Sequence, residues 1–247
     1  MKKTLLALTT ILVFQIPHVV AESVTFESSI EQVGLLELYT SEGCSSCPPA
    51  DEWLSQLKTH RGVWSDFIPI ALHVDYWDYI GWKDRFASPN YAKRQRQYAK
   101  EQSLRAVYTP GFVYNGAEWR KWYSSREVKF PAGDAPGILR LEVNGGDARV
   151  EFAPTASAKR KLQVNLALLG FDLETHVRAG ENRGKSLPHD FVVLGMRQVK
   201  VTQREGGYST QFALPTPGEE ARQYGVVAWV NSPGKQQPIQ AVGGFLP

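Results

Sequence analysis

The most informative segment of the chain is residues 35–49, with the sequence LLELYTSEGCSSCPP. Its first part, residues 35–40, is an apolar run with the character of a strand. The second part holds Cys44 and Cys47, the only two cysteines of the chain, separated by two serines. Two thiols at this spacing, where a strand turns into a helix, can form and break a disulfide reversibly. The segment therefore predicts a redox-active dithiol.

A helix predicted directly after the dithiol would activate one of the thiols. Residues 50–57 carry apolar side chains at helical spacing, and Pro48 and Pro49 suit a first helical turn, where N–H groups have no partner. The partial positive charge of a helix N-terminus stabilises a thiolate. We expect Cys44, which is nearer the loop, to attack a substrate disulfide and Cys47 to resolve the mixed disulfide.

Three other uses of the two cysteines stay open on the sequence alone. A structural disulfide with this spacing closes a small loop and stabilises the fold little. A zinc site commonly has four ligands, whereas the chain has one such cysteine pair. Copper could bind Cys44, Cys47 and His73, because thiolates and imidazole suit this metal. A strand-end histidine bonded in the core is the alternative for His73. The prediction includes no cofactor and no resident metal.

The first 21 residues have the pattern of a secretory signal. Lys2 and Lys3 precede a short apolar run, and small residues precede a predicted cleavage after Ala21. An uncleaved anchor is the alternative, but no stretch approaches the roughly 18 apolar residues of a spanning helix. Cleavage leaves 26 of the 28 Lys and Arg against 25 acids, a formal net charge of +1. This balance does not favour nucleic acid or an anionic membrane as partner. We expect a periplasmic or secreted protein.

The character of the sequence changes at residues 131–137. Before them, strand-like and helix-like runs alternate, with a second strand over 67–74 parallel to the first and a surface helix over 91–104. After them, short β-type runs alternate with Gly- and Pro-containing turns. The sequence therefore predicts an α/β domain over residues 30–135 and an all-β sandwich over residues 137–247.

A proline follows the second predicted strand, in the sequence Tyr-Thr-Pro-Gly-Phe of residues 108–112. The order strand, Cys-x-x-Cys, helix, strand, helix, Thr-Pro, strand resembles the thioredoxin superfamily. This resemblance implies a thioredoxin-like N-terminal domain in which a cis Pro110 and Thr109 face Cys44, with Thr109 binding the extended chain of a partner. It also implies a buried acid beneath the dithiol, and Glu37 is the candidate for this general base. An edge strand with Glu37 facing water is the alternative.

Two features depart from thioredoxin: the spacer is Ser-Ser, and Glu37 lies one residue further from the first cysteine than expected. A closer resemblance is to an exported bacterial family of unknown function with a thioredoxin-like N-terminal domain, domain of unknown function 1223. The segments that carry it are residues 38–51, 73–78, 81–84, 108–110 and 178–185. This resemblance implies the fold and export of the protein, but the family has no settled biochemical role.

The sequence predicts a periplasmic thiol–disulfide oxidoreductase that acts through a mixed disulfide. Its predicted partners are protein thiol or disulfide substrates and an external redox partner, because the chain has no further cysteine. Trp77 and Trp82 lie in an aromatic loop after the second strand and are predicted to receive a client peptide, with core packing as the alternative. The competing prediction is a thioredoxin-like binding or copper-handling protein without exchange activity.

Overall fold

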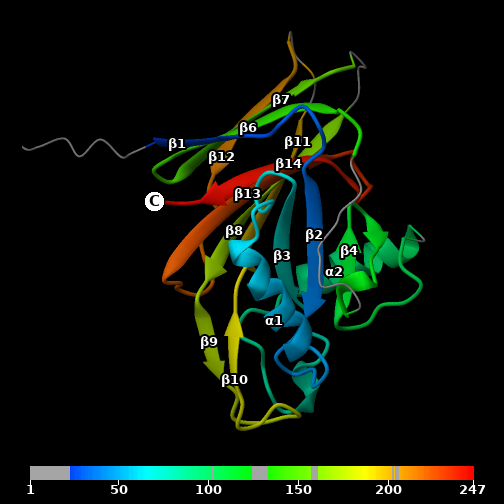
Figure 1. Ribbon diagram of the computed structural model, residues 1–247, viewed down its shortest axis with the longest axis vertical. Helices are drawn as coiled ribbons and strands as arrows, with labels where there is room; N and C mark the ends of the chain where they lie inside the picture. Colours follow the sequence, from blue (N-terminus) through cyan, green and yellow to red (C-terminus); the bar gives the residue numbers. More distant parts are fainter. Residues whose placement is uncertain (1–22, 102, 124–132, 157–160, 202, 204–205) are drawn as a thin grey trace, which may run out of the picture.

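The computed structural model describes residues 23–247 except 102, 124–132, 157–160, 202 and 204–205, so the predicted signal sequence lies outside the described residues. The largest layer is an eight-stranded mixed sheet with the order β14-β13-β8-β11-β3-β2-β4-β5 (Figure 1). Its strands are β2 (Gly34–Thr40), β3 (Phe67–His73), β4 (Gly111–Tyr114), β5 (Ala117–Glu118), β8 (Leu162–Phe171), β11 (Val192–Val201), β13 (Gln223–Asn231) and β14 (Pro238–Phe245).

A four-stranded antiparallel sheet packs on one end of the large sheet. It contains β1 (Ser23–Glu27), β6 (Gly137–Asn144), β7 (Asp147–Pro154) and β12 (Tyr208–Ala213), in the order β1-β6-β7-β12. Along β6 the side chains alternate between buried and outward, so one face joins side chains of β8 and β13 in a shared apolar core. At the other end of the molecule, β9 (Leu173–His176) and β10 (Ser186–His189) extend as a separate ribbon (Figure 1).

Two α-helices lie on opposite faces of β2: α1 (Pro48–Gln56) and α2 (Pro89–Lys100). The hydroxyl of Thr40 donates to Asp51 of α1, whereas Glu37 pairs with Arg94 of α2. Side chains alternate along a strand, so two positions three residues apart point to opposite faces. Three short 3₁₀ helices complete the described helical segments: η1 (Leu57–Thr59), η2 (Asp78–Ile80) and η3 (Lys121–Tyr123). No described helix has the length and apolarity to cross a membrane.

Several predicted elements are confirmed. The first predicted strand is β2, and the second is β3, which runs parallel to it with Thr40 opposite His73. The first helix begins at Pro48 with Cys47 as its N-cap. The helix predicted over 91–104 is α2, which spans Pro89–Lys100. A tight turn with positive φ at Asn115 and Gly116 joins β4 to β5.

The predicted fold class, an α/β thioredoxin-like domain followed by an all-β sandwich, is wrong. The described part of the chain is rich in β-sheet, with 45% of its residues in strands and 14% in helices. The physical reason is that β3 has a partner on its second side: Val192 of β11 pairs with Ala71. Through β11 the sheet continues into β8, β13 and β14, so strands from both predicted domains share one hydrogen-bonded layer. The boundary between residues 135 and 137 stays a prediction.

Candidate functional site

The two cysteines lie in the loop that joins β2 to α1. Cys44 and Cys47 form a disulfide, and their Cα atoms are 5.4 Å apart. Two successive turns shape the loop, in which Cys44 N–H donates to the Ser41 carbonyl and Cys47 N–H donates to the Cys44 carbonyl. The spacer residues Ser45 and Ser46 are exposed, but the cysteines are 1% and 0% exposed. The dithiol is thus placed at a helix N-terminus, as predicted, with both side chains covered.

A loop that contains Glu181 and Asn182 forms hydrogen bonds with the backbone around the cysteines. The Glu181 carboxylate accepts the N–H of Ser45 at 3.0 Å, and hydrogen bonds from the side chain and the backbone of Ser45 lower the pKa of Glu181. The buried amide of Asn182 donates to the carbonyls of Glu42 and Cys44 at 2.8 and 2.9 Å. Access of a polypeptide to Cys44 therefore requires this loop, or the dithiol loop itself, to move.

Trp77 connects the dithiol loop with the predicted Thr-Pro site. A Cβ atom added to Gly43 would lie 3.0 Å from Cβ of Trp77, so the two residues are in close contact. The indole N–H of Trp77 donates to the Thr109 hydroxyl at 2.7 Å. The Thr109–Pro110 peptide bond is cis, as the resemblance implied. Trp77 thus lies between Gly43, the residue before Cys44, and Thr109. Binding of a client by these side chains stays a prediction.

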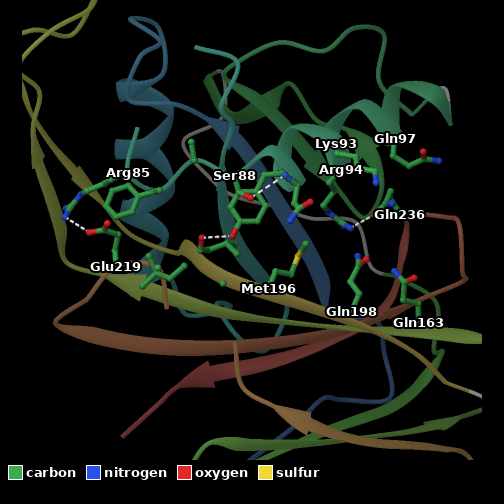
Figure 2. Close-up of a pocket in the computed structure, with 18 of the residues that line it drawn as sticks. Arg85, Ser88, Lys93, Arg94, Gln97, Gln163, Met196, Gln198, Glu219 and Gln236 are labelled. Carbon is green, nitrogen blue, oxygen red and sulfur yellow. Dashed lines mark hydrogen bonds and ion pairs between the residues drawn. The ribbon is translucent and has the colours of Figure 1, made fainter. Parts of the chain in front are cut away.

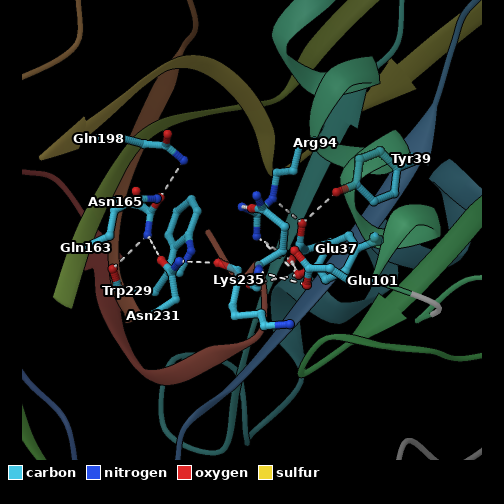
Figure 3. Close-up of polar contacts among 12 residues, drawn as sticks. Glu37, Tyr39, Arg94, Glu101, Gln163, Asn165, Gln198, Trp229, Asn231 and Lys235 are labelled. Carbon is cyan, nitrogen blue, oxygen red and sulfur yellow. Dashed lines mark hydrogen bonds and ion pairs between the residues drawn. The ribbon is translucent and has the colours of Figure 1, made fainter. Parts of the chain in front are cut away.

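Glu37 lies on the other face of the sheet, in a buried ion pair. Its carboxylate accepts hydrogen bonds from Arg94 at 2.7 and 2.8 Å, from Tyr39 at 2.9 Å and from Tyr98 at 2.5 Å (Figure 3). Burial raises the pKa of both tyrosines well above the ordinary value, and the Glu37 charge adds to this effect. Glu37 is fully buried, but its partners belong to α2 and to its own strand, and this geometry does not support the predicted role at the dithiol.

A second buried group, which sequence reasoning missed, surrounds the base of the dithiol loop at the carboxyl ends of β2 and β3. It comprises five ionisable side chains that are 0–6% exposed: Glu42, Asp51, His73, Asp84 and His189. We call it the histidine–carboxylate cluster. Asp51 lies one helical turn after Cys47, whose carbonyl accepts the N–H of Asp51 at 3.1 Å. Trp82, predicted to bind a client, donates its indole N–H to Glu42 at 2.7 Å.

His73 and Asp84 form the charged centre of this cluster. Their Nδ1 and Oδ2 atoms are 2.7 Å apart. Burial acts to lower the pKa of His73, but the charge and hydrogen bond of Asp84 outweigh it and raise this pKa to about 9. Burial acts to raise the pKa of Asp84, but His73 and backbone N–H groups lower it. The pair is therefore ionised at neutral pH.

The rest of the cluster is incompletely hydrogen-bonded. His189 Nε2 lies 3.4 Å from Glu42 Oε1, but the geometry is not that of a hydrogen bond. Four buried atoms have no hydrogen-bond partner: Glu42 Oε1, His73 Nε2, and Nδ1 and Nε2 of His189. Burial raises the pKa of Asp51, although the nearby histidines oppose this shift. Buried polar atoms are normally paired, so this cluster is an unusual feature that fits a chemical role.

A cavity gives this cluster a connection to the surface. It has a volume of about 470 Å³ and is lined by Asp51 and His189 together with residues of the α1 N-terminus and of β10. Within the described residues, no three or more His, Cys, Asp or Glu side chains are arranged to hold a metal ion. The copper-handling alternative uses Cys44 and Cys47 as thiolates, whereas they form a disulfide here, and it stays a prediction.

Comparison with protein families matches the chain to a family described as a protein of unknown function (DUF1223), over residues 35–231. The chain belongs to this family. The matched residues of this DUF1223 protein include the dithiol and the whole histidine–carboxylate cluster. Membership of the thioredoxin superfamily is not shown by this match.

Comparison with curated proteins found no match. Two solved structures are similar to the DUF1223 protein. One is a protein from Agrobacterium tumefaciens with 22% identity and a TM-score of 0.57, covering 87% of this chain and 94% of that one. The other is HBP35 of Porphyromonas gingivalis, with 15% identity and a TM-score of 0.63, covering 89% of this chain and 76% of that one. At these identities the similarity concerns the fold, and it supports the β-rich architecture.

Proposed function

We propose that this DUF1223 protein is an exported thiol–disulfide oxidoreductase. The observation that carries the proposal is a Cys44–Cys47 disulfide at the N-terminus of α1, with the buried acid Asp51 one turn further along the helix. The secretory pattern of residues 1–21 supports a periplasmic or secreted location, and disulfides persist in such oxidising compartments.

The proposed reaction transfers two electrons from the reduced dithiol to a protein disulfide. The Cys44 thiolate attacks one substrate sulfur, a Cys44–substrate bond forms, and the other substrate sulfur leaves as a thiolate that takes up a proton. Cys47 then loses its proton and attacks Cys44 Sγ, which releases the first substrate sulfur as a thiol. The product is the protein disulfide present in this structure, and an external thiol protein must return the two electrons.

Asp51 is the proposed acceptor of the Cys47 proton. An acid four residues after Cys47 lies on the same side of α1, and the Thr40 hydroxyl holds its carboxylate by a hydrogen bond of 3.0 Å. A carboxyl whose pKa is raised by burial is a better base for a thiol than an exposed one. His189 shares the neighbouring cavity and offers a path for the proton to the surface.

The client segment is proposed to bind beside Trp77, Thr109 and Pro110. Support comes from the contact of Trp77 with Gly43 and from its hydrogen bond to Thr109, which join the Thr-Pro site to the dithiol loop. Trp82 belongs to the same aromatic loop, but its bond to Glu42 ties it to the histidine–carboxylate cluster.

The burial of both cysteines favours a second candidate, a binding protein in which the disulfide is structural. Equilibration with glutathione buffers of graded ratio, followed by thiol alkylation and mass spectrometry, separates the two. Oxidoreductase activity predicts a reduction potential of the Cys44–Cys47 disulfide between about −270 and −120 mV. The reduction potentials of structural disulfides lie below about −300 mV. The Cys47→Ser variant should trap a mixed disulfide with a protein substrate through Cys44, and the Cys44→Ser control should not. A potential below −300 mV, with no trapped complex, would overturn the proposal.

A further inference from the structure

A larger cavity, of about 660 Å³, lies between α2 and β11, and its walls include neither cysteine. Figure 2 shows it as an elongated groove that runs from Arg85 and Glu219 at one end to Gln97 and Gln163 at the other. We call it the α2–β11 groove. Its wall residues span positions 90–97 of α2 and 193–198 of β11, about 10 Å along a helix and about 16 Å along a strand. The groove therefore has room for about three to five extended residues.

One side of this groove is the open edge of a strand. Except at a bulge at Leu194, β11 pairs with β8 along its length, but on the other side it pairs with β3 only through Val192. The carbonyls of Val193 and Leu194 accept bonds from the Tyr91 hydroxyl and from the N–H of Gly218. From Gly195 onwards, no described strand is paired with this edge. An unpaired strand edge is a template for the backbone of another extended chain.

Carboxamide side chains supply much of the polar lining. They come from both walls and from neighbouring strands and loops: Asn90, Gln97, Gln163, Gln198 and Gln236. A carboxamide has the same donor and acceptor groups as a peptide bond, so this lining suits a polypeptide backbone. Part of it is held in place, because Gln198 donates to Asn165 at 2.7 Å (Figure 3) and Gln236 accepts from Arg94 (Figure 2).

Two other ligand classes fit this groove less well. A sugar usually stacks on an open aromatic face, but Phe86 and Tyr91, the aromatic wall residues, are each 5% exposed. A phosphate would use free N–H groups at the start of α2. Here Ser88 already accepts the N–H groups of Asn90 through its hydroxyl and of Tyr91 through its carbonyl.

The charges of the lining indicate which peptide fits. Arg85 is paired with Glu219 at 3.1 Å, and Arg94 is neutralised by Glu37. Lys93 is exposed on the wall and has no acidic partner among the described residues. We propose that the α2–β11 groove binds an extended peptide segment that adds a strand to β11 and places an acidic side chain at Lys93. This inference does not rest on the proposed redox activity.

The test uses a pool of acetylated, amidated octapeptides in which each position holds Glu, Thr or Val. The pool is titrated into the isotope-labelled protein, and backbone amide shifts are followed by NMR. Shifts should concentrate on β11 and α2, and a pool N-methylated at every residue should produce none, because it has no backbone N–H group to donate to the edge of β11. The same result is expected for the Cys44→Ser variant, which separates this site from the proposed exchange reaction.

Matched variants locate the site. Lys93→Glu should weaken peptide binding about five-fold, the size expected for the loss of an exposed ion pair. Arg96→Glu makes the same charge change on α2 but outside the groove, and it should leave peptide binding unchanged. In Gln198→Trp the new side chain should fill the groove. In the control Arg197→Trp the new side chain lies on the opposite face of β11, outside the groove. Absence of shifts, equal shifts with the N-methylated pool, or equal losses in Lys93→Glu and Arg96→Glu would overturn the inference.

Discussion

The two faces of β2 each bury ionised side chains, but they do so differently. On the α2 face, the carboxylate of Glu37 accepts four hydrogen bonds and Arg94 balances its charge. On the α1 face, the histidine–carboxylate cluster leaves four buried polar atoms without a hydrogen-bond partner. A fully paired group fixes one arrangement of charges and protons. An incompletely paired group can accept or release a proton without first breaking a complete network, and this is the face that carries the dithiol.

The largest expected effect comes from breaking the paired face. Glu37→Gln removes the charge that compensates buried Arg94 and should lower the free energy of unfolding by about 3–5 kcal/mol. Urea denaturation followed by tryptophan fluorescence measures this loss. Glu37→Leu combined with Arg94→Met should recover much of it, because neither charge then remains buried. The dithiol potential should not change in any variant that folds; a shifted potential, or a loss below 1 kcal/mol, would contradict this assignment.

Glu37 also shows where sequence reasoning reached its limit. The sequence predicted correctly that this glutamate is buried, but its role depends on which face of β2 it occupies. Thr40, three residues later, points to α1, so Glu37 points to α2. The available signal was that Glu37 lies one residue further from Cys44 than the thioredoxin spacing. A shift of one residue along a strand moves a side chain to the opposite face.

The other parts of the site differ in whether a local sequence pattern could reveal them. Asp51 could have been found, since its spacing of four residues from Cys47 places both on one side of a helix. His189 joins Asp51 through the packing of β10 against α1, across more than a hundred residues of sequence. The fold class failed for the same reason, because the β-type runs after residue 137 were recognised while the contact of Val192 with Ala71 was not.

On the α1 face, the ion pair of His73 predicts a pH dependence of stability. The pKa of His73 is about 9 in the folded protein against an ordinary 6.5, so its contribution is complete below pH 6.5 and is lost as the pH rises through 9. The difference corresponds to about 3 kcal/mol. Urea unfolding at pH 6 and pH 10 should show this loss in the wild type and a smaller one in His73→Asn. Equal pH dependence of the two proteins would show that the pair does not carry it.

A smaller effect is expected from the proposed base. Asp51→Asn should slow the Cys47 step about 10²-fold, the lower end for general base catalysis. Stopped-flow measurement of mixed-disulfide decay gives this rate. In the wild type, the rate should fall as acid protonates Asp51, and because burial raises its pKa, this fall should begin above the pH typical of an exposed aspartate. Exposed Glu52, the next residue of α1, provides the control Glu52→Gln. Similar decay rates in both variants would remove Asp51 from the mechanism.

The smallest expected effect concerns Glu181, in the loop that is hydrogen-bonded to the dithiol loop. Glu181 is exposed, and its carboxylate holds the dithiol loop by hydrogen bonding to Ser45. Removal of this hydrogen bonding in Glu181→Ala should favour the open state and accelerate reduction of the disulfide by dithiothreitol about two- to five-fold. Glu220→Ala, at another exposed position, should leave the rate unchanged. If neither variant reacts faster, the dithiol opens by another route, and the cover over Cys44 lies with Trp77 and its bond to Thr109.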